Sequence, residues 1–128
     1  MDVRDILIDV DMKYPNDVET EHKWTWITQM EKLLLHECLL THELSEEEMN
    51  RAAALYALEN VDRDYKPLAQ PPYQDIYIHY LGMQIALLNV DTDQYENEQT
   101  LYNNALLAYK NWFSRTHRAR IAGDKWRF

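Results

Sequence analysis

The segment from residue 73 to residue 89, YQDIYIHYLGMQIALLN, restricts the fold more than any other part of the sequence. A rotation of 100° per residue places its apolar side chains on an arc of about 220°. An ordinary surface helix has an apolar stripe from about 100° wide, so this helix must be covered on several sides. Asp75, His79 and Asn89 occupy the remaining polar sector. Gln84 lies inside the apolar arc and is therefore expected to have a hydrogen-bond partner.

The other long segments also repeat apolar residues at helical spacing. With only two glycines and four prolines, the chain has little turn chemistry for a many-stranded β fold. We therefore predict an all-α fold. It is a small helical bundle with an N-terminal helix pair, a Pro-rich loop and two long, nearly antiparallel C-terminal helices. The predicted helices cover residues 3–12, 20–42, 46–59, 73–89 and 94–117.

Short polar residues stand at the predicted helix starts. Their side chains can accept hydrogen bonds from the free N–H groups of the first turn. A glutamate three residues later completes a capping box. The predicted caps are Asp17 or Thr20 for the second helix, Ser45 with Glu48 for the third, and Asp93 with Glu96 for the last.

Aromatic residues recur along the two C-terminal helices. Tyr95, Tyr102 and Tyr109 are spaced seven residues apart, which favours shallow, nearly antiparallel packing against the preceding helix. Tyrosine combines a large apolar area with one polar tip, which suits helix contacts and subunit contacts that are partly wet. We expect packing and subunit-interface roles for seven aromatic residues: Tyr73, Tyr77, Tyr80, Tyr95, Tyr102, Tyr109 and Trp112.

The charge is unevenly distributed along the chain. The net charge is −9, yet residues 114–128 carry a local charge of +4. Nucleic-acid-binding proteins usually present a broad basic face, which this arrangement does not provide. We predict a helical domain over residues 1–117 and a basic tail over residues 118–128 that meets an acidic partner. The alternative is that the basic end is a solvated, poorly ordered terminus.

The sequence also bears on the compartment. Cys38 is the only cysteine, so no internal disulfide can form, and synthesis in a reducing cytoplasm is expected. No apolar run reaches the roughly 18 residues of a membrane span. The N-terminus, MDVRDILIDVD, is acidic where a signal peptide would be basic.

Candidate metal and catalytic motifs fail on ligand number or spacing. Cys38 and His42 are four residues apart, but a stable zinc site needs three or four ligands. The run from Asn60 to Pro71 begins like a calcium loop, but it lacks the glycine and the terminal glutamate. There is no glycine-rich phosphate loop and no serine in a nucleophile elbow. We predict no metal, no cofactor and no enzymatic activity.

Residues 3–42 and 68–117 contain a combination of motifs with a family resemblance. The most specific are PPYQDIYIHYL in the fourth predicted helix and YENEQTLYNNALLAYKNWFSRTH in the fifth. Together with ILIDVDMKYPND and KWTWITQMEKLLLHECLLTH near the N-terminus, they resemble the head–tail connector proteins of long-tailed bacteriophages and their prophages. These proteins are also called adaptor or head-completion proteins.

The resemblance implies an all-helical subunit of the virion, made in the cytoplasm of the host bacterium. Several copies would form a closed ring beneath the portal protein, following the portal's twelvefold symmetry. The ring would extend the DNA channel without sequence-specific DNA binding or membrane contact, and would offer a platform to the next neck protein. By position in the chain, the portal-binding residues would be Arg118, Arg120, Ile121, Trp126, Arg127 and Phe128.

Two other functions remain open at this point. The first is another virion or DNA-packaging component, such as a small packaging subunit, which needs a DNA-binding face. The second is a small helical enzyme or metal protein, for which Cys38 and His42 would be the starting point.

Overall fold

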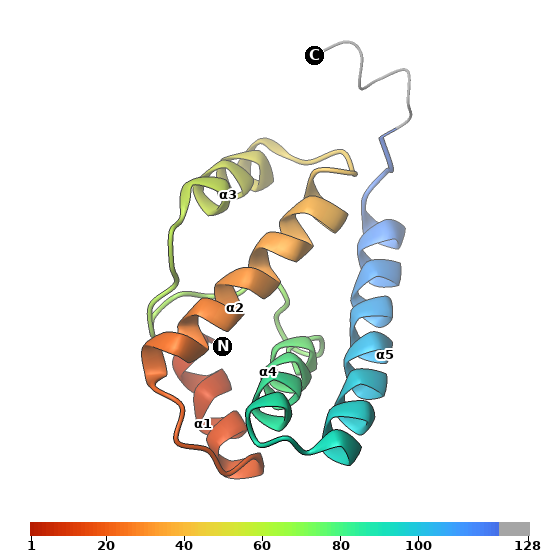
Figure 1. Cartoon of the computed structure of the whole chain (residues 1–128). Coiled ribbons are helices and arrows are strands. Elements are labelled where there is room, and N and C mark those ends of the chain that lie inside the picture. The colour runs from red at the N-terminus through yellow and green to blue at the C-terminus, as the bar shows by residue number, and fades with distance from the viewer. Residues whose placement is uncertain (121–128) are drawn as a thin grey trace.

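The computed structural model describes residues 1–120 of the chain as a bundle of helices (Figure 1). One of them, η1, is a π-helical turn that continues α2 without a break. The predicted all-α class is confirmed. The elements are α1 (Val3–Lys13), α2 (Thr20–Leu34), η1 (Leu35–Leu39), α3 (Glu46–Ala57), α4 (Asp75–Leu88) and α5 (Thr92–Thr116).

Helices α4 and α5 pack against each other along their lengths. The Tyr73 ring lies 6.0 Å from the Tyr109 ring, and the Tyr80 ring lies 5.7 Å from the Tyr102 ring. Residue numbers therefore rise along α4 as they fall along α5, so the pair is antiparallel, as the seven-residue repeat predicted. Val90, with φ of 52°, forms the tight turn between the two helices.

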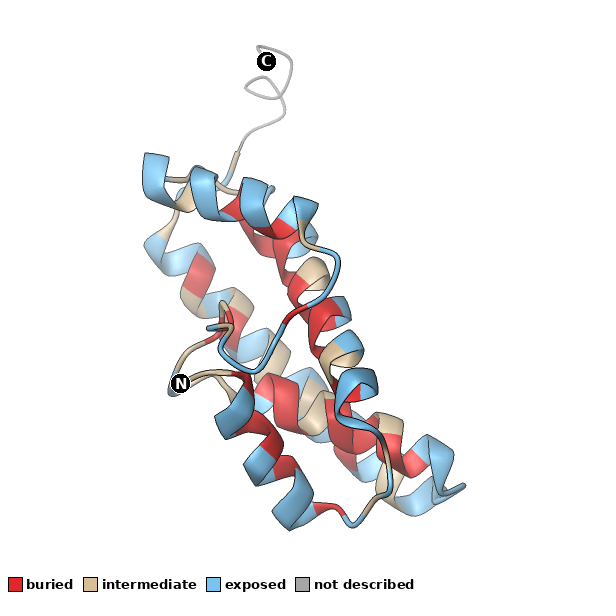
Figure 2. Cartoon of the chain, turned by 90° about the vertical axis from the view of Figure 1, so that its left-hand side faces the viewer, coloured by how far each residue is buried: buried red, intermediate tan, exposed pale blue. Residues whose placement is uncertain are grey.

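Helix α4 lies at the centre of the bundle and contacts α1, α2 and α5 (Figure 1). The buried residues of the surrounding helices face inward, toward it and toward one another (Figure 2). This arrangement explains the wide apolar arc in the sequence, because a helix with neighbours on three sides needs apolar side chains around most of its circumference. Its buried residues are Ile76, Tyr77, Ile78, Leu81, Gly82, Met83, Ile85 and Ala86.

Gly82 lets three elements approach closely in the middle of α4. A Cβ atom at this position would lie 2.9 Å from Tyr14 Cζ and 3.1 Å from Glu98 Oε2. The Nδ1 atom of His79 lies 2.7 Å from the same Glu98 oxygen. The His79 side chain is only 16% exposed, so part of the predicted polar sector faces α5 and not solvent.

The loop between α3 and α4 closes the N-terminal end of α1. The backbone N–H groups of Val3 and Arg4 donate to the carbonyl oxygens of Tyr65 and Arg63, at 3.0 and 3.1 Å. Both N–H groups belong to the first turn of α1, where no partner exists within the helix. The Pro-rich loop is therefore attached to the bundle by hydrogen bonds from N–H groups of α1 that have no partner within that helix.

Several predicted helix ends were wrong. The helix predicted over 20–42 becomes a π-turn after Leu34, where the Leu40 N–H donates to the Leu35 carbonyl at 2.9 Å. The third helix ends at Ala57 and not at residue 59, because Leu58 adopts an extended backbone that starts the loop. The fourth begins at Asp75 and not at residue 73, because Tyr73 closes a turn onto the Gln70 carbonyl.

The predicted caps had mixed outcomes. The Ser45 capping box with Glu48 is confirmed. Neither Asp17 nor Thr20 caps α2; Glu19 occupies the N-cap position without a side-chain bond. For α5 the cap is Asp91 instead of Asp93, because the extended backbone at Asp91 aims its carboxylate at the Gln94 N–H, 3.1 Å away.

Candidate functional site

A carboxylate is buried at the centre of the bundle, where α2 meets α4 and the Pro-rich loop. Glu31 is 0% exposed. The Tyr65 hydroxyl donates to its Oε2 atom at 2.7 Å, and the fully buried Tyr77 hydroxyl donates to Oε1. The Leu68 N–H donates to Oε2 at 3.1 Å, and the Tyr77 hydroxyl in turn accepts from the Ala69 N–H at 2.9 Å. Two helices and the loop are thus fastened to one side chain.

Burial dominates the ionisation of this cluster. It raises the pKa of Glu31 above its ordinary value, against the opposing effect of the hydrogen bonds from Tyr77, Tyr65 and Leu68. Burial and the adjacent Glu31 carboxylate also raise the pKa values of Tyr65 and Tyr77. Because both carboxylate oxygens already have protein donors, the cluster fits a structural role in holding the loop.

A second aromatic cluster holds the C-terminal half of α5. The Tyr109 ring is buried and lies 5.6 Å from the Trp112 ring, and Tyr73 packs 5.4 Å from the same Trp112 ring. Phe113 stacks on His117 with ring centroids 3.9 Å apart. The predicted aromatic residues at this end of α5 therefore pack within a single copy of the chain.

The other predicted tyrosines also make contacts within the chain. Tyr80 and Tyr102 are half-buried against each other, and burial raises the pKa of Tyr102 to about 12. The Tyr80 hydroxyl donates to Gln29 Oε1 at 3.2 Å, and the hydrogen bond expected for Gln84 stays a prediction. Tyr95 is half-buried beside the turn between α4 and α5. Intramolecular packing is thus observed for Tyr80 and Tyr102, and the part of all three tyrosines in subunit contacts stays a prediction.

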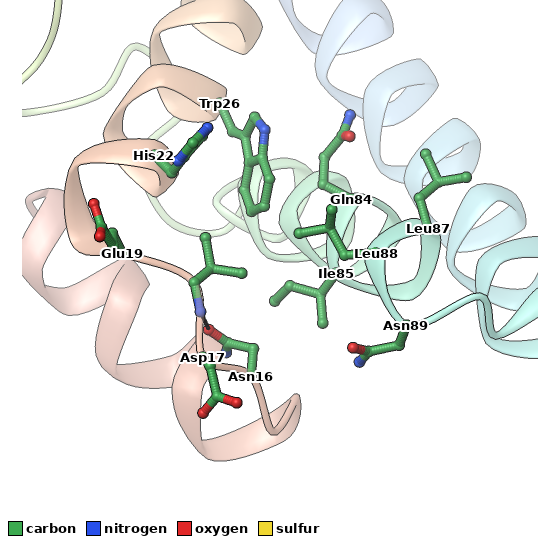
Figure 3. A pocket seen from close by; sticks show the side chains of 11 residues that line it. Asn16, Asp17, Glu19, His22, Trp26, Gln84, Ile85, Leu87, Leu88 and Asn89 are labelled. Atoms are coloured by element: carbon green, nitrogen blue, oxygen red, sulfur yellow. Dashed lines mark hydrogen bonds between the residues drawn. The ribbon is translucent and has the colours of Figure 1, made fainter.

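A surface groove of about 760 Å³ lies between the start of α2 and the C-terminal end of α4 (Figure 3). Trp26 from α2 and Leu88 from α4 both project into it (Figure 3). Leu87 and Leu88 are 54% and 62% exposed, which is unusual for adjacent leucines in a helix whose other apolar side chains are mostly buried. The lining consists of Asn16, Asp17, Val18 and Glu19 of the α1–α2 turn, His22 and Trp26 of α2, and Gln84, Ile85, Leu87, Leu88 and Asn89.

The groove is apolar in its middle and acidic at one end. Asp17 and Glu19 are exposed on the turn, and none of the eleven lining residues is a lysine or an arginine. Figure 3 shows Asp17 and Glu19 on the side of the groove formed by the α1–α2 turn and the start of α2, across from the end of α4. Such a surface can accept apolar side chains that are flanked by positive charge.

A second exposed apolar surface lies on α3, at the opposite end of the molecule from the groove (Figure 1). Met49 and Tyr56 are 49% and 67% exposed and stand seven residues apart on this helix. The Tyr56 ring lies 6.5 Å from the His36 ring of η1. The groove and the exposed face of α3 are thus two separate apolar surfaces that differ in composition, and other apolar side chains, such as Ile8, Met12 and Leu107, are exposed elsewhere.

The described part of the predicted basic tail runs beside the segment that follows η1. The Glu43 N–H donates to the Arg118 carbonyl at 2.7 Å, and the Arg120 N–H donates to the Thr41 carbonyl at 3.0 Å. An isolated antiparallel β-bridge joins His42 to Ala119. Portal binding by Arg118 and Arg120 stays a prediction. The other predicted tail residues, Ile121, Trp126, Arg127 and Phe128, lie outside the described residues.

Basic side chains over residues 1–120 have local partners in several places. Lys23 is buried and lies 2.6 Å from Asp11, and Lys110 lies 3.2 Å from Glu37. Arg4 and Arg63 both approach Asp64. These pairs divide the positive charge among carboxylates instead of gathering it on one face.

The environment of Cys38 differs from that of a metal ligand. The side chain is buried, and burial raises the pKa of the thiol to about 11. The Nδ1 atom of His42 donates to the Cys38 carbonyl at 2.7 Å, so this ring nitrogen is already used. Across residues 1–120, no group of three or more His, Cys, Asp or Glu side chains is placed to hold a metal ion.

Sequence reasoning missed the residues that organise both sites. Glu31 falls on the same helical stripe as the buried Ile27 and Leu34, and an acid in such a stripe is a signal that could have been read. The groove gave no comparable signal, because Trp26 and Leu88 look like ordinary core residues in the sequence.

Comparisons with known proteins identify no relative of this chain. Searches against family models, curated proteins and solved structures each found no significant match. In the described range, 1–120, no helix has the length and apolarity needed to cross a membrane.

Proposed function

We propose that this protein is a structural adaptor in the neck of a tailed bacteriophage. Copies would form a ring beneath the portal, extend the DNA channel and join the head to the tail. The proposal starts from the motif resemblance in the fourth and fifth helices. The observation that carries it beyond resemblance is the pair of different apolar surfaces at opposite ends of the molecule, the groove and the exposed face of α3.

A closed ring needs such an arrangement. Head-to-tail assembly joins one surface of a subunit to a different surface of the next, and it closes when the rotation between subunits divides a full turn. A self-complementary dimer would need only one surface. Two unlike surfaces on one small chain therefore favour a cyclic assembly over an isologous pair.

The charge suits the wall of a DNA channel. The net charge is −9, and the basic residues named above are paired with carboxylates. Phosphates are bound chiefly by unpaired Lys and Arg side chains, and negative surfaces repel them. DNA can then move through the ring without adhering to it. The same charge disfavours a packaging subunit that grips the duplex.

Electron microscopy of phage particles made without this protein tests the proposal. The adaptor function predicts DNA-filled heads and separate tails that fail to join, with whole virions restored when the wild-type chain is supplied in trans. Heads that stay empty of DNA would favour a packaging component instead. Intact tailed virions from the deletion would contradict both.

A further inference from the structure

We infer that the groove between α2 and α4 binds the C-terminal segment, residues 121–128, of a neighbouring copy of the same chain. The inference rests on the ring assembly proposed above, because it names an occupant for the groove in the contact between one copy and the next. In this assembly residues 121–128 are used between copies and not, as the resemblance implies, against the portal, and the exposed face of α3 is left for another contact. It is argued from the chemistry of the groove, the chemistry of the segment and the distance between them.

The segment and the groove are complementary in character. Residues 121–128, IAGDKWRF, alternate basic and aromatic residues at their end, with Lys125 and Arg127 on either side of Trp126. The groove offers an apolar floor beside the acidic turn that carries Asp17 and Glu19. Aromatic side chains in apolar pockets commonly anchor protein contacts, and charges at the rim set their direction.

The groove is also large enough for such anchors. Its volume of about 760 Å³ lies within the range of pockets that hold drug-sized molecules, roughly 300–1,000 Å³. The exposed Leu87 and Leu88 would be covered by the arriving aromatic rings. Occupation of the groove would therefore shield from water two adjacent leucines that are exposed when the groove is empty.

The distance bears on whether the same copy or a neighbour supplies the segment that covers the Leu88 end of the groove. Residues 118–120 are held beside residues 41–43, at the end of the molecule opposite the groove (Figure 1). The 25 residues of α5 separate the Leu88 end of the groove from that point, about 37 Å at 1.5 Å per residue. Trp126 stands six residues beyond Arg120, and six fully extended residues reach at most about 21 Å.

Trp126 therefore cannot reach the Leu88 end of the groove in its own copy, whereas nothing limits it in a second copy. The resulting contact is heterologous, because it joins the C-terminal segment of one subunit to the groove of the next. Repetition of such a contact builds either a ring or a filament.

Two variants with opposite defects test this contact. Leu88→Lys places a positive charge in the groove, and a tail variant combines Trp126→Ser with Phe128→Ser. Leu107→Lys is the matched control, because Leu107 is similarly exposed at 57% but lies outside the groove. All are made in the full chain, and circular dichroism checks that each keeps the wild-type helix content.

Sedimentation velocity over a range of concentrations gives the readout. The wild type and the Leu107→Lys control should self-associate, and raising sodium chloride from about 0.05 to 0.5 M should weaken association several-fold. The groove variant and the tail variant should each raise the dissociation constant at least tenfold. Mixed together, they should form a 1:1 pair that does not grow, since one intact groove meets one intact tail.

Three results would overturn the inference. The wild type could remain monomeric at all concentrations, either variant could associate like the wild type, or the mixture could show no pair. If the wild type, the groove variant and the tail variant all self-associate to the same extent, the groove contact is wrong. That result would not contradict the ring assembly, which would then use another contact. The particle experiment decides the adaptor function separately.

Discussion

The two ends of helix α4 are both rich in apolar residues, but some apolar side chains at its C-terminal end are left uncovered, although Ile85 and Ala86 beside them are buried. Tyr77 and Leu81 are 0% exposed, and the loop, α1, α2 and α5 surround this half. Leu87 and Leu88 follow about two turns after Leu81 and are more than half exposed at the edge of a groove. An apolar run in a sequence therefore predicts side chains that must pack against other residues. Only the structure shows whether those residues belong to the same chain.

The carboxylates near the two ends of α4 also differ in how far their hydrogen bonds are satisfied within one copy. At the buried end, the Glu31 carboxylate receives hydrogen bonds from two tyrosine hydroxyls and the Leu68 N–H. At the exposed end, Asp17 and Glu19 face solvent beside the groove. One end is thus complete within a single copy, whereas the other has the composition of an interface.

The largest effect is expected from removing the buried carboxylate. Glu31→Ala leaves the Tyr65 and Tyr77 hydroxyls and the Leu68 N–H without an acceptor, and it opens a cavity. We expect a loss of about 3–5 kcal/mol in the free energy of unfolding. Urea denaturation followed by circular dichroism measures it. The control is Glu59→Ala at an exposed position, expected to stay within about 0.5 kcal/mol; equal effects for the two variants would refute the role of Glu31.

The comparison within α4 is tested by two leucines placed seven residues apart. Leu81→Ala should cost about 2–5 kcal/mol, because Leu81 is 0% exposed in the core. Leu88→Ala should change stability by less than about 0.5 kcal/mol, because Leu88 is 62% exposed. Thermal or urea unfolding of dilute samples gives both values. Similar losses for the two variants would show that the groove end belongs to the core of one copy.

A smaller effect is expected from pH. The pKa of Glu31 is raised in the folded state above its ordinary value of 4.5. As pH rises from about 4.5 through the raised value, the folded chain holds this proton more tightly than the unfolded chain does, so the contribution of Glu31 to stability falls. Glu31→Gln cannot titrate. The stability of the wild type relative to Glu31→Gln should therefore decrease between pH 4.5 and neutrality.

Unfolding of both proteins at matched pH values checks this, and other titrating groups largely cancel in the difference. Glu48 is one such group: burial opposes its ionisation, but hydrogen bonds from Ser45 and His117 lower its pKa overall. A difference that is constant or rises over this range would contradict the assignment of a raised pKa to Glu31.

Periodicity predicted the presence and order of the helices, because long amphipathic segments fix which face must be buried. It failed at helix ends that depend on the backbone, such as the π-turn after Leu34 and the cap at Asp91. It also failed where residues distant in sequence meet. The contact of Tyr77 with Glu31 and the pairing of residues 118–120 with residues 41–43 both depend on tertiary placement that no local pattern encodes.

Hydrogen–deuterium exchange of the wild-type chain at two widely separated concentrations tests the central comparison most directly. If the groove end of α4 is an interface between copies, amides of residues 84–89 and of the turn over residues 16–19 should exchange more slowly at the higher concentration. Amides of residues 76–82 should exchange equally slowly at both. Exchange that does not change with concentration at residues 84–89, or that slows equally along the whole of α4, would contradict the account.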